Sequence, residues 1–150
     1  MGAAFLLRDF LQARGLETLV KTSGGKGLHI QLPLRPKYGW DLLKEFTRQV
    51  SLAVAAYNPL KFTTVVSKSR RKGKIFIDYL RNGRGATCIA PWCVRARNRA
   101  PISMPVSRND LPQVTPAGFT IAEPPQTPPD WLKLDRQQIT KAHLKEFGLR

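Results

Sequence analysis

Apolar residues near the start of the chain recur at helical spacing. Phe5, Leu6, Phe10 and Leu11 fall on one side of a helix with 3.6 residues per turn. Gly15 stands where a helix usually ends, because glycine adopts the left-handed backbone of a C-terminal cap without steric cost. These positions predict a first helix that ends just before Gly15.

Two later segments also have regular patterns of apolar residues. The residues at 28–32 alternate between apolar and polar, which is typical of a half-buried strand, and Pro33 and Pro36 end it. From Asp41 to Tyr57 apolar residues repeat every three or four positions, and Asn58-Pro59 closes the run. The spacing therefore predicts a strand at 28–32 and the longest helix of the chain at 41–57.

The middle of the chain predicts a hairpin, and the remainder is less regular. Residues 62–66 and 75–80 are rich in β-branched and aromatic side chains, and a basic turn, residues 67–74, separates them. Prolines accumulate over 98–129, where we expect short irregular elements, and a weak helix is predicted at 135–147. The alternation of helices and strands implies an α+β fold, with helices over one face of a mostly antiparallel sheet.

The chain is strongly basic. Twenty-five Lys and Arg against ten Asp and Glu leave a net charge of +15 in 150 residues, which suit one domain. Such an excess favours a polyanionic partner, since neutralised phosphates release condensed counterions. Nucleic acid is the favoured partner. The alternatives are that the chain is a basic protein of the ribosomal type or one that contacts anionic lipid.

Cysteine content and hydropathy indicate where in the cell the protein works. Cys88 and Cys93 are the only cysteines, and their spacing matches neither a redox pair nor half of a zinc site. No apolar run reaches the roughly 20 residues that span a bilayer. Charges at Arg8 and Asp9 come too early for a secretory signal. We therefore expect a cytoplasmic protein without a membrane segment.

The glycine-rich segment at 21–30, KTSGGKGLHI, is the first candidate site. Its glycines allow successive backbone N–H groups to converge on an anion, and a lysine adds a positive charge. Ser23 could donate its hydroxyl hydrogen, and His29 could face the same pocket from the next strand. The segment lacks the Walker A pattern. A plain hairpin turn and a structural histidine are the alternative interpretation.

Asp78 is the second unusual position, because it falls within the apolar run Ile75–Leu80. A carboxylate there is costly if buried without a partner, so it either pairs with an arginine or binds a metal ion. Arginines follow it closely, and guanidinium groups suit bidentate phosphate recognition, although exposed arginines often only face solvent. They are Arg81, Arg84, Arg95 and Arg97.

These two segments closely resemble the polymerase domain of bacterial ligase D, an archaeo-eukaryotic primase-type enzyme of non-homologous end joining. The resemblance rests on KTSGGKGLH and, about fifty residues later, GKIFIDYLRNGRGAT with AP and RAR after it, and it covers roughly residues 3–121. It implies an RRM-like primase-type catalytic sheet and nucleotidyl transfer with Mn²⁺ or Mg²⁺. It also implies filling of short gaps at DNA double-strand breaks from nucleoside triphosphates, beside Ku and a DNA ligase domain.

The resemblance assigns roles by position. Ser23 and His29 would contact the triphosphate of the incoming nucleotide, and Asp78 would be a metal-binding carboxylate. The other nucleotide-binding residues it implies are Gly24, Gly25, Lys26, Gly27, Arg81, Arg95 and Arg97. The basic turn would hold template or primer backbone through Lys68, Arg70, Arg71, Lys72 and Lys74.

One departure from the family pattern weakens the expectation of catalysis. The family carries an Asp-x-Asp pair upstream of the first helix, whereas no two acidic residues of this sequence are separated by one position. A single carboxylate would leave two metal ions underliganded. We therefore expect residues 1–121 to be the C-terminal part of a primase-polymerase domain, incomplete at the N-terminus and inactive alone. Residues 122–150 would be a proline-rich linker with a weak terminal helix. A non-catalytic, basic nucleic-acid-binding protein is the alternative.

Overall fold

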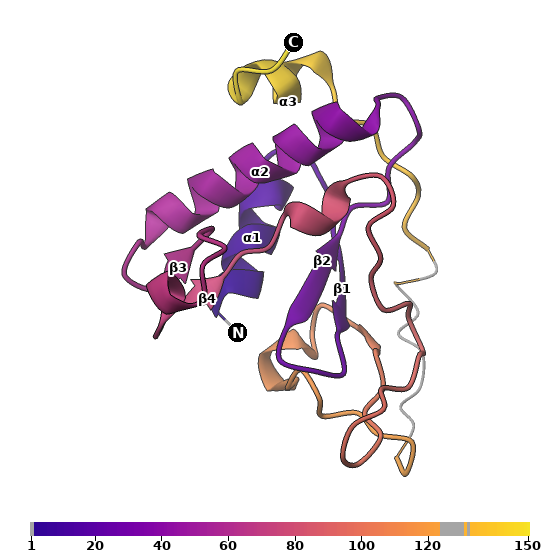
Figure 1. Cartoon of the computed structure of the whole chain (residues 1–150). Helices are drawn as coiled ribbons and strands as arrows, with labels where there is room; N and C mark the ends of the chain where they lie inside the picture. Colours follow the sequence, from indigo (N-terminus) through magenta and orange to yellow (C-terminus); the bar gives the residue numbers. More distant parts are fainter. Residues whose placement is uncertain (1, 124–130, 132) are drawn as a thin grey trace.

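The computed structural model describes residues 2–123, 131 and 133–150, and it has an α+β fold (Figure 1). Short 3₁₀ helices, η1 (Ser69–Arg71), η2 (Leu80–Asn82) and η3 (Leu111–Gln113), lie in the connections. The helices and strands in chain order are α1 (Gly2–Gln12), β1 (Leu19–Thr22), β2 (Leu28–Gln31), α2 (Trp40–Tyr57), β3 (Phe62–Thr63), β4 (Ile75–Phe76), β5 (Pro105–Val106) and α3 (Lys141–Glu146).

The central sheet is antiparallel with the strand order β2-β1-β5. Val20 on β1 lies opposite Ile30 on β2 and Val106 on β5, while Lys21 lies opposite His29. Because side chains alternate along a strand, the three apolar residues share one face and Lys21 and His29 share the other. The sheet therefore has an apolar face for packing and a cationic face for a site.

α1 and α2 cover the apolar face of this sheet. Ile30 packs against the cluster that contains Leu11 of α1 and Phe46 of α2, and Val20 packs with Val106 beside Phe5 of α1. The two helices cross in Figure 1, with α2 running diagonally over α1. The helix predicted at 41–57 is confirmed almost to the residue, and Gly15 has the expected cap conformation, with φ of 71°.

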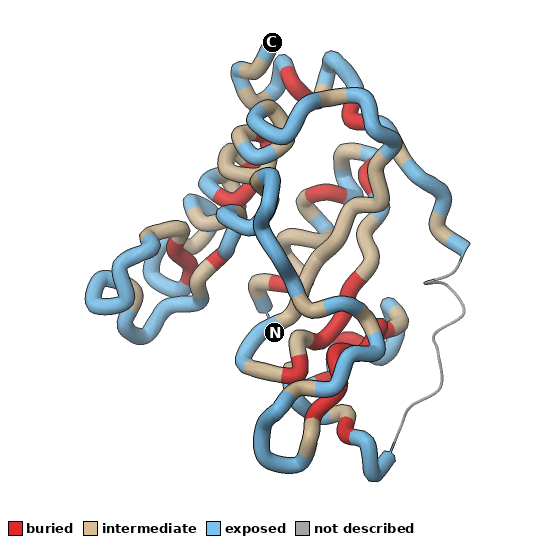
Figure 2. Tube along the Cα trace, turned by 45° about the vertical axis from the view of Figure 1, so that its right-hand side comes forward, coloured by how far each residue is buried: buried red, intermediate tan, exposed pale blue. Residues whose placement is uncertain are grey.

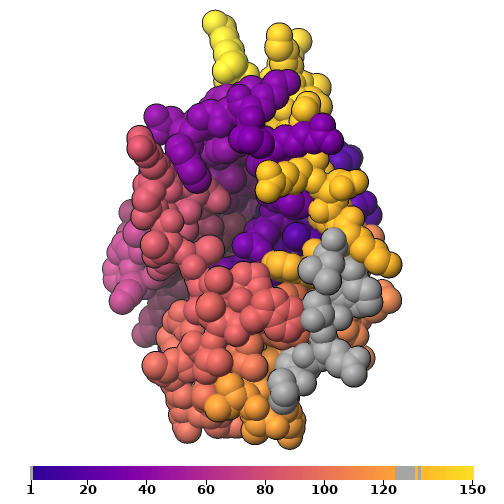
Figure 3. Space-filling model, turned by 90° about the vertical axis from the view of Figure 1, so that its right-hand side faces the viewer, coloured from indigo at the N-terminus to yellow at the C-terminus, as the bar shows by residue number. Residues whose placement is uncertain are grey.

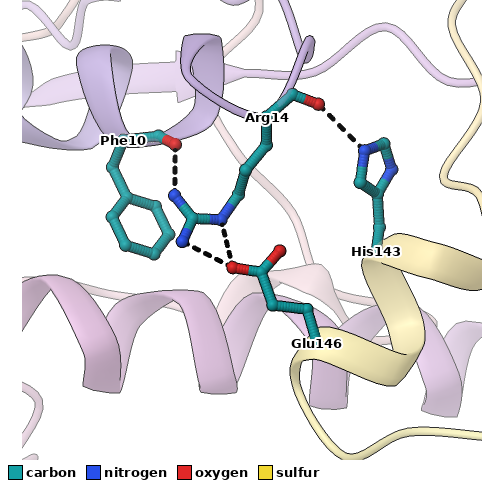
Figure 4. Close-up of polar contacts among 4 residues, drawn as sticks. All are labelled: Phe10, Arg14, His143 and Glu146. Carbon is teal, nitrogen blue, oxygen red and sulfur yellow. Dashed lines mark hydrogen bonds and ion pairs between the residues drawn. The ribbon is translucent and has the colours of Figure 1, made fainter.

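α3 joins the two helices through polar and aromatic contacts. The Arg14 guanidinium donates to Glu146 Oε1 from Nε at 2.9 Å and from Nη2 at 2.6 Å, and Nη1 donates to the carbonyl of Phe10 (Figure 4). The ring of Phe147, just beyond α3, meets Phe46 edge-on at 5.5 Å between centroids. α3 begins only at Lys141, so it is shorter than the helix predicted at 135–147.

The predicted hairpin between 62–66 and 75–80 is wrong. β3 and β4 pair in parallel, with Ile75 N donating to Lys61 O and Ile77 N donating to Thr63 O. Residues 64–74, which include η1, are long enough to bring the chain back to the start of β3. β5 was not expected inside the irregular region; it extends the sheet beside β1. Residues 124–130 of that region lie outside the described residues.

Candidate functional site

The glycine-rich segment forms the turn between β1 and β2. Ser23 N donates to Gly27 O at 3.1 Å, and Ser23 Oγ accepts from the N–H groups of Gly25 and Gly27 at 3.2 Å each. In this structure the N–H groups of Gly25 and Gly27 therefore converge on the serine oxygen, and their role in binding an anion stays a prediction. Because the serine oxygen accepts two hydrogen bonds, its own O–H remains as a donor.

Gly24 of this turn lies against the segment that carries Arg95. Its φ is +61°, and a Cβ there would come within 2.6 Å of Arg95 Cγ and 3.2 Å of Pro101 O. The arginine segment is itself a hairpin, because Arg95 N donates to Pro101 O and Ser103 N donates to Cys93 O. We call residues 92–103 the arginine hairpin. Only a glycine allows this close approach of two backbones.

The second arginine of the hairpin also reaches the turn. The guanidinium carbon of Arg97 would lie 3.8 Å from a Cβ on Gly25, so it sits over the backbone of that glycine. Arg95 is half-buried and Arg97 is exposed. Two segments about seventy residues apart in the sequence therefore place a serine hydroxyl and two guanidinium groups around one turn. The structure thus brings Arg95 and Arg97 to the turn that holds Ser23, and their role in binding a nucleotide stays a prediction.

His29 on β2 borders the same turn from the cationic face of the sheet. Burial lowers the pKa of its imidazole, and the positive charges of Lys21, Arg81 and Arg95 lower it further, while Asp78 opposes them. The neutral imidazole is thus favoured near neutral pH. His29 lies directly opposite Lys21 on the neighbouring strand, and its joint action with Asp78 at one site stays a prediction.

Asp78 does not lie on a strand, contrary to the prediction. β4 ends at Phe76, and Asp78 stands exposed in the turn before η2, where its Oδ1 accepts from Leu80 N at 2.9 Å. The partner strand β3 has only two residues, so the ladder ends and the carboxylate stabilises a local turn instead. The following Arg81 donates from Nη1 to Thr87 O at 2.6 Å.

The described residues do not form a metal centre. Among residues 2–123, 131 and 133–150, no three His, Cys, Asp or Glu side chains gather where they could hold one ion. Mg²⁺ and Mn²⁺ prefer several oxygen ligands, and Asp78 already accepts a backbone hydrogen bond with one of its oxygens. These side chains do not suffice for the Mn²⁺ or Mg²⁺ that the resemblance implies, and no metal-dependent step follows from them.

Lys21 is a residue of this site that sequence reasoning missed. Its side chain is 0% exposed, and its ammonium donates to Ile89 O at 2.7 Å and to Ser103 Oγ at 2.8 Å. Burial lowers its pKa. The available signal was its position between Val20 and Thr22 in a short apolar strand, directly across the ladder from His29.

The chain matches the LigD primase-polymerase domain over residues 1–131. It belongs to the LigD primase-polymerase family. It is 45% identical over 109 residues to the multifunctional non-homologous end joining protein LigD of Pseudomonas aeruginosa, which covers 73% of this chain and 13% of that protein. It is 30% identical over 121 residues to the bifunctional LigD of Bacillus subtilis, covering 79% of this chain and 20% of that protein.

The fold agrees with this membership. The polymerase domain of Mycobacterium tuberculosis Ligase D, solved in complex with DNA, superimposes with a TM-score of 0.70 at 32% identity. The alignment covers 74% of this chain and 39% of that chain, so this LigD-family chain spans well under half of the solved domain. No helix among the described residues is long and apolar enough to cross a membrane.

The basic turn of this LigD-family chain projects away from the sheet. Most residues between β3 and β4 are exposed, as Figure 2 shows for the loop that extends beside the helices. Lys68, Arg70 and Lys72 are exposed, whereas Arg71 lies 4.3 Å over the ring of Phe76 and Lys74 donates to Pro59 O. Arg71 and Lys74 therefore pack the basic turn against Phe76 and Pro59.

Segments from several parts of the chain also border one depression. In Figure 3 the surface is hollowed between the start of α2 in purple, a rose-coloured segment and the yellow segment that follows residue 132. Atoms of the N-terminal third form the floor of this depression. The depression is thus bordered by segments that are distant in the sequence.

Proposed function

We propose that the chain binds a nucleoside triphosphate at the turn Ser23–Gly27, as part of a DNA-repair nucleotidyltransferase. The contact between Gly24 and Arg95 carries this proposal, because it brings the arginine hairpin onto the glycine turn. Template-dependent gap filling at double-strand breaks in non-homologous end joining would be the activity of the whole protein. The antiparallel sheet β2-β1-β5 would belong to the RRM-like catalytic sheet of the family.

The phosphates would be held by side-chain donors rather than by the backbone N–H groups of Gly25 and Gly27, which already donate to Ser23. Ser23 offers its hydroxyl hydrogen, and Arg95 and Arg97 offer guanidinium forks that match phosphate oxygens. Lys26 is exposed and adds a positive charge on the solvent-facing side of the turn. His29 would stabilise negative charge from the sheet, and Asp78 would contribute one carboxylate to any metal site that further residues complete.

Titration with a fluorescent nucleoside triphosphate, with and without Mn²⁺, tests this proposal. We expect binding that weakens at least about tenfold in Arg95→Gln, because a charge-assisted phosphate contact contributes about 1.5 to 3 kcal/mol. His29→Ala should weaken it as well, and Asp78→Ala should remove any gain that Mn²⁺ provides. Lys141→Gln on α3 is the matched control. Equal affinity in wild type and Arg95→Gln would reject the site.

A non-catalytic, basic nucleic-acid-binding protein is the second candidate. It is favoured by the net charge of +15 together with the lack of a three-ligand metal cluster among the described residues. This candidate predicts DNA binding that weakens with salt but does not change in Asp78→Ala or His29→Ala. Measuring DNA and nucleotide binding on the same variants therefore separates the two functions.

DNA ends, Ku and a DNA ligase domain remain proposed partners. The Mycobacterium tuberculosis domain was solved in complex with DNA, and the exposed basic residues of the turn between β3 and β4 would face such a polyanion here. A pull-down of Ku in the presence and absence of broken DNA would test the protein partner directly. A cytoplasmic location stays a prediction.

A further inference from the structure

Lys21 is a buried cation, and none of the described residues pairs a carboxylate with it. Its side chain is 0% exposed, and the described ion pairs, Arg8–Asp9, Arg14–Glu146 and Arg48–Glu45, do not include it. Both of its hydrogen-bond acceptors are neutral, the carbonyl of Ile89 and the hydroxyl of Ser103. A methionine would fill similar space without the desolvation cost of a charge.

The charged groups that act on the Lys21 ammonium include no carboxylate. Burial is the main cause that lowers the pKa of its ammonium; ionised thiols at Cys88 and Cys93 would raise that pKa, and Arg95 of the arginine hairpin lowers it. On the sheet Lys21 lies opposite His29. Since the folded chain holds the proton less tightly than the unfolded chain, this lysine lowers the stability of the fold near neutral pH.

The hydrogen bonds of Lys21 connect the parts of the proposed nucleotide site. Ile89 belongs to the segment before the arginine hairpin, and Ser103 ends that hairpin. Ser103 Oγ in turn donates to Thr22 O, one residue before Ser23. The ammonium thus lies under the junction where the hairpin meets the glycine turn. It is enclosed there and does not reach the solvent-facing side of the turn.

We propose that Lys21 is a positioning residue of the nucleotide site, whose buried charge fixes the arginine hairpin and attracts the polyphosphate without touching it. This inference rests on the proposed function. A positive charge in a poorly solvated site attracts an anion over several ångströms, because little water screens it. The stability that the fold loses by burying this charge would be recovered when a triphosphate binds.

Lys21→Met tests the inference by two measurements that a purely structural role would not produce together. We expect the triphosphate affinity to fall about tenfold or more, and the thermal midpoint to stay equal or rise. The affinity loss should be the same at low and high salt, because the charge is buried. Lys26→Met, which removes an exposed charge on the same turn, is the control whose effect should shrink as salt increases.

Proton uptake on binding gives a second test. A bound polyphosphate should raise the pKa of Lys21, so calorimetry of ATP binding over a series of alkaline pH values, in buffers of different ionisation enthalpy, should show more proton uptake by the wild-type chain than by Lys21→Met. Equal proton uptake by the two chains, or unchanged ATP affinity in Lys21→Met, would overturn the inference. Absence of ATP binding by the wild-type chain would instead reject the proposed function.

Discussion

Gly24 and Arg95 are in direct contact, although they lie about seventy residues apart in the sequence. A Cβ on Gly24 would stand 2.6 Å from Arg95 Cγ, and the backbone of Gly24 has a φ of +61°. Two separate requirements therefore apply to this glycine, a left-handed conformation and the absence of a side chain. The contact connects the glycine turn and the arginine hairpin into one surface.

Gly24→Ala should damage both the fold and the site. The left-handed backbone alone costs about 1 to 2 kcal/mol for alanine, and the clash with Arg95 and Pro101 adds to it. Gly15→Ala is a matched control, because Gly15 has a φ of +71° and nothing within 4 Å of its added Cβ. Urea unfolding should show a larger loss for Gly24→Ala. Only Gly24→Ala should weaken nucleotide binding, and equal binding losses in both variants would contradict this account.

His29 should make the stability of the chain depend on pH. The pKa of His29 lies below its ordinary value of 6.5 because of burial and the nearby cations, so the unfolded chain binds a proton first as the pH falls. The contribution of His29 is therefore complete above 6.5 and declines as the pH drops from there toward its folded pKa. His29→Gln should flatten this part of a melting-temperature profile. An unchanged slope in His29→Gln would show that another group causes the decline.

Local patterns in the sequence were sufficient to predict α2 and the turn at Ser23–Gly27. The helix has regular apolar spacing along its 18 residues, and the turn has three glycines between Ser23 and Leu28. The resemblance to a known family supplied the link between Ser23, His29, Asp78 and the arginines, which no spacing rule provides. The elements that formed as predicted are those whose signal lies within one short stretch.

The remaining features depend on residues far apart in the chain. The ammonium of Lys21 is held by Ile89 and Ser103, which are 68 and 82 residues away, so its neighbours Val20 and Thr22 can suggest burial but cannot identify these partners. β3 and β4 are parallel because residues 64–74 carry the chain back to the start of β3. Two-residue strands contain too little alternation of polar and apolar side chains for the sequence to predict this parallel pairing. Pro105-Val106 is a strand only because β1 lies beside it.

α3 should depend more on its aromatic contact than on its ion pair. The side chains of Arg14 and Glu146 are 24% and 42% exposed, so their pair should contribute at most about 1 kcal/mol. Phe147 packs edge-on against Phe46 and near Phe10, and its removal should cost about 1.5 to 3 kcal/mol. Denaturant unfolding of Phe147→Ala and Glu146→Gln should show this order. A larger effect for Glu146→Gln would mean that the ion pair holds the helix.

We expect no detectable primer extension by these 150 residues alone, even with Mn²⁺. The sequence has no Asp-x-Asp pair, and the described residues offer no cluster of three metal-binding side chains. Nucleotidyl transfer with two metal ions needs carboxylates that bridge both. The assay is extension of a labelled primer opposite a short gap, with a complete LigD polymerase domain as the positive control. Robust Mn²⁺-dependent addition by highly purified chain would contradict the prediction.

The exposed basic residues between β3 and β4 should contribute to nucleic-acid binding through counterion release. Lys68→Gln and Lys72→Gln together should reduce the slope of log affinity against log salt by about 0.7 to 0.9 for each phosphate that the turn no longer neutralises. The weakening should be equal for different DNA sequences, since phosphate contacts carry no sequence information. Lys141→Gln with Lys145→Gln removes the same charge from α3 and is the matched control. If both pairs change the slope equally, net charge rather than this turn determines binding.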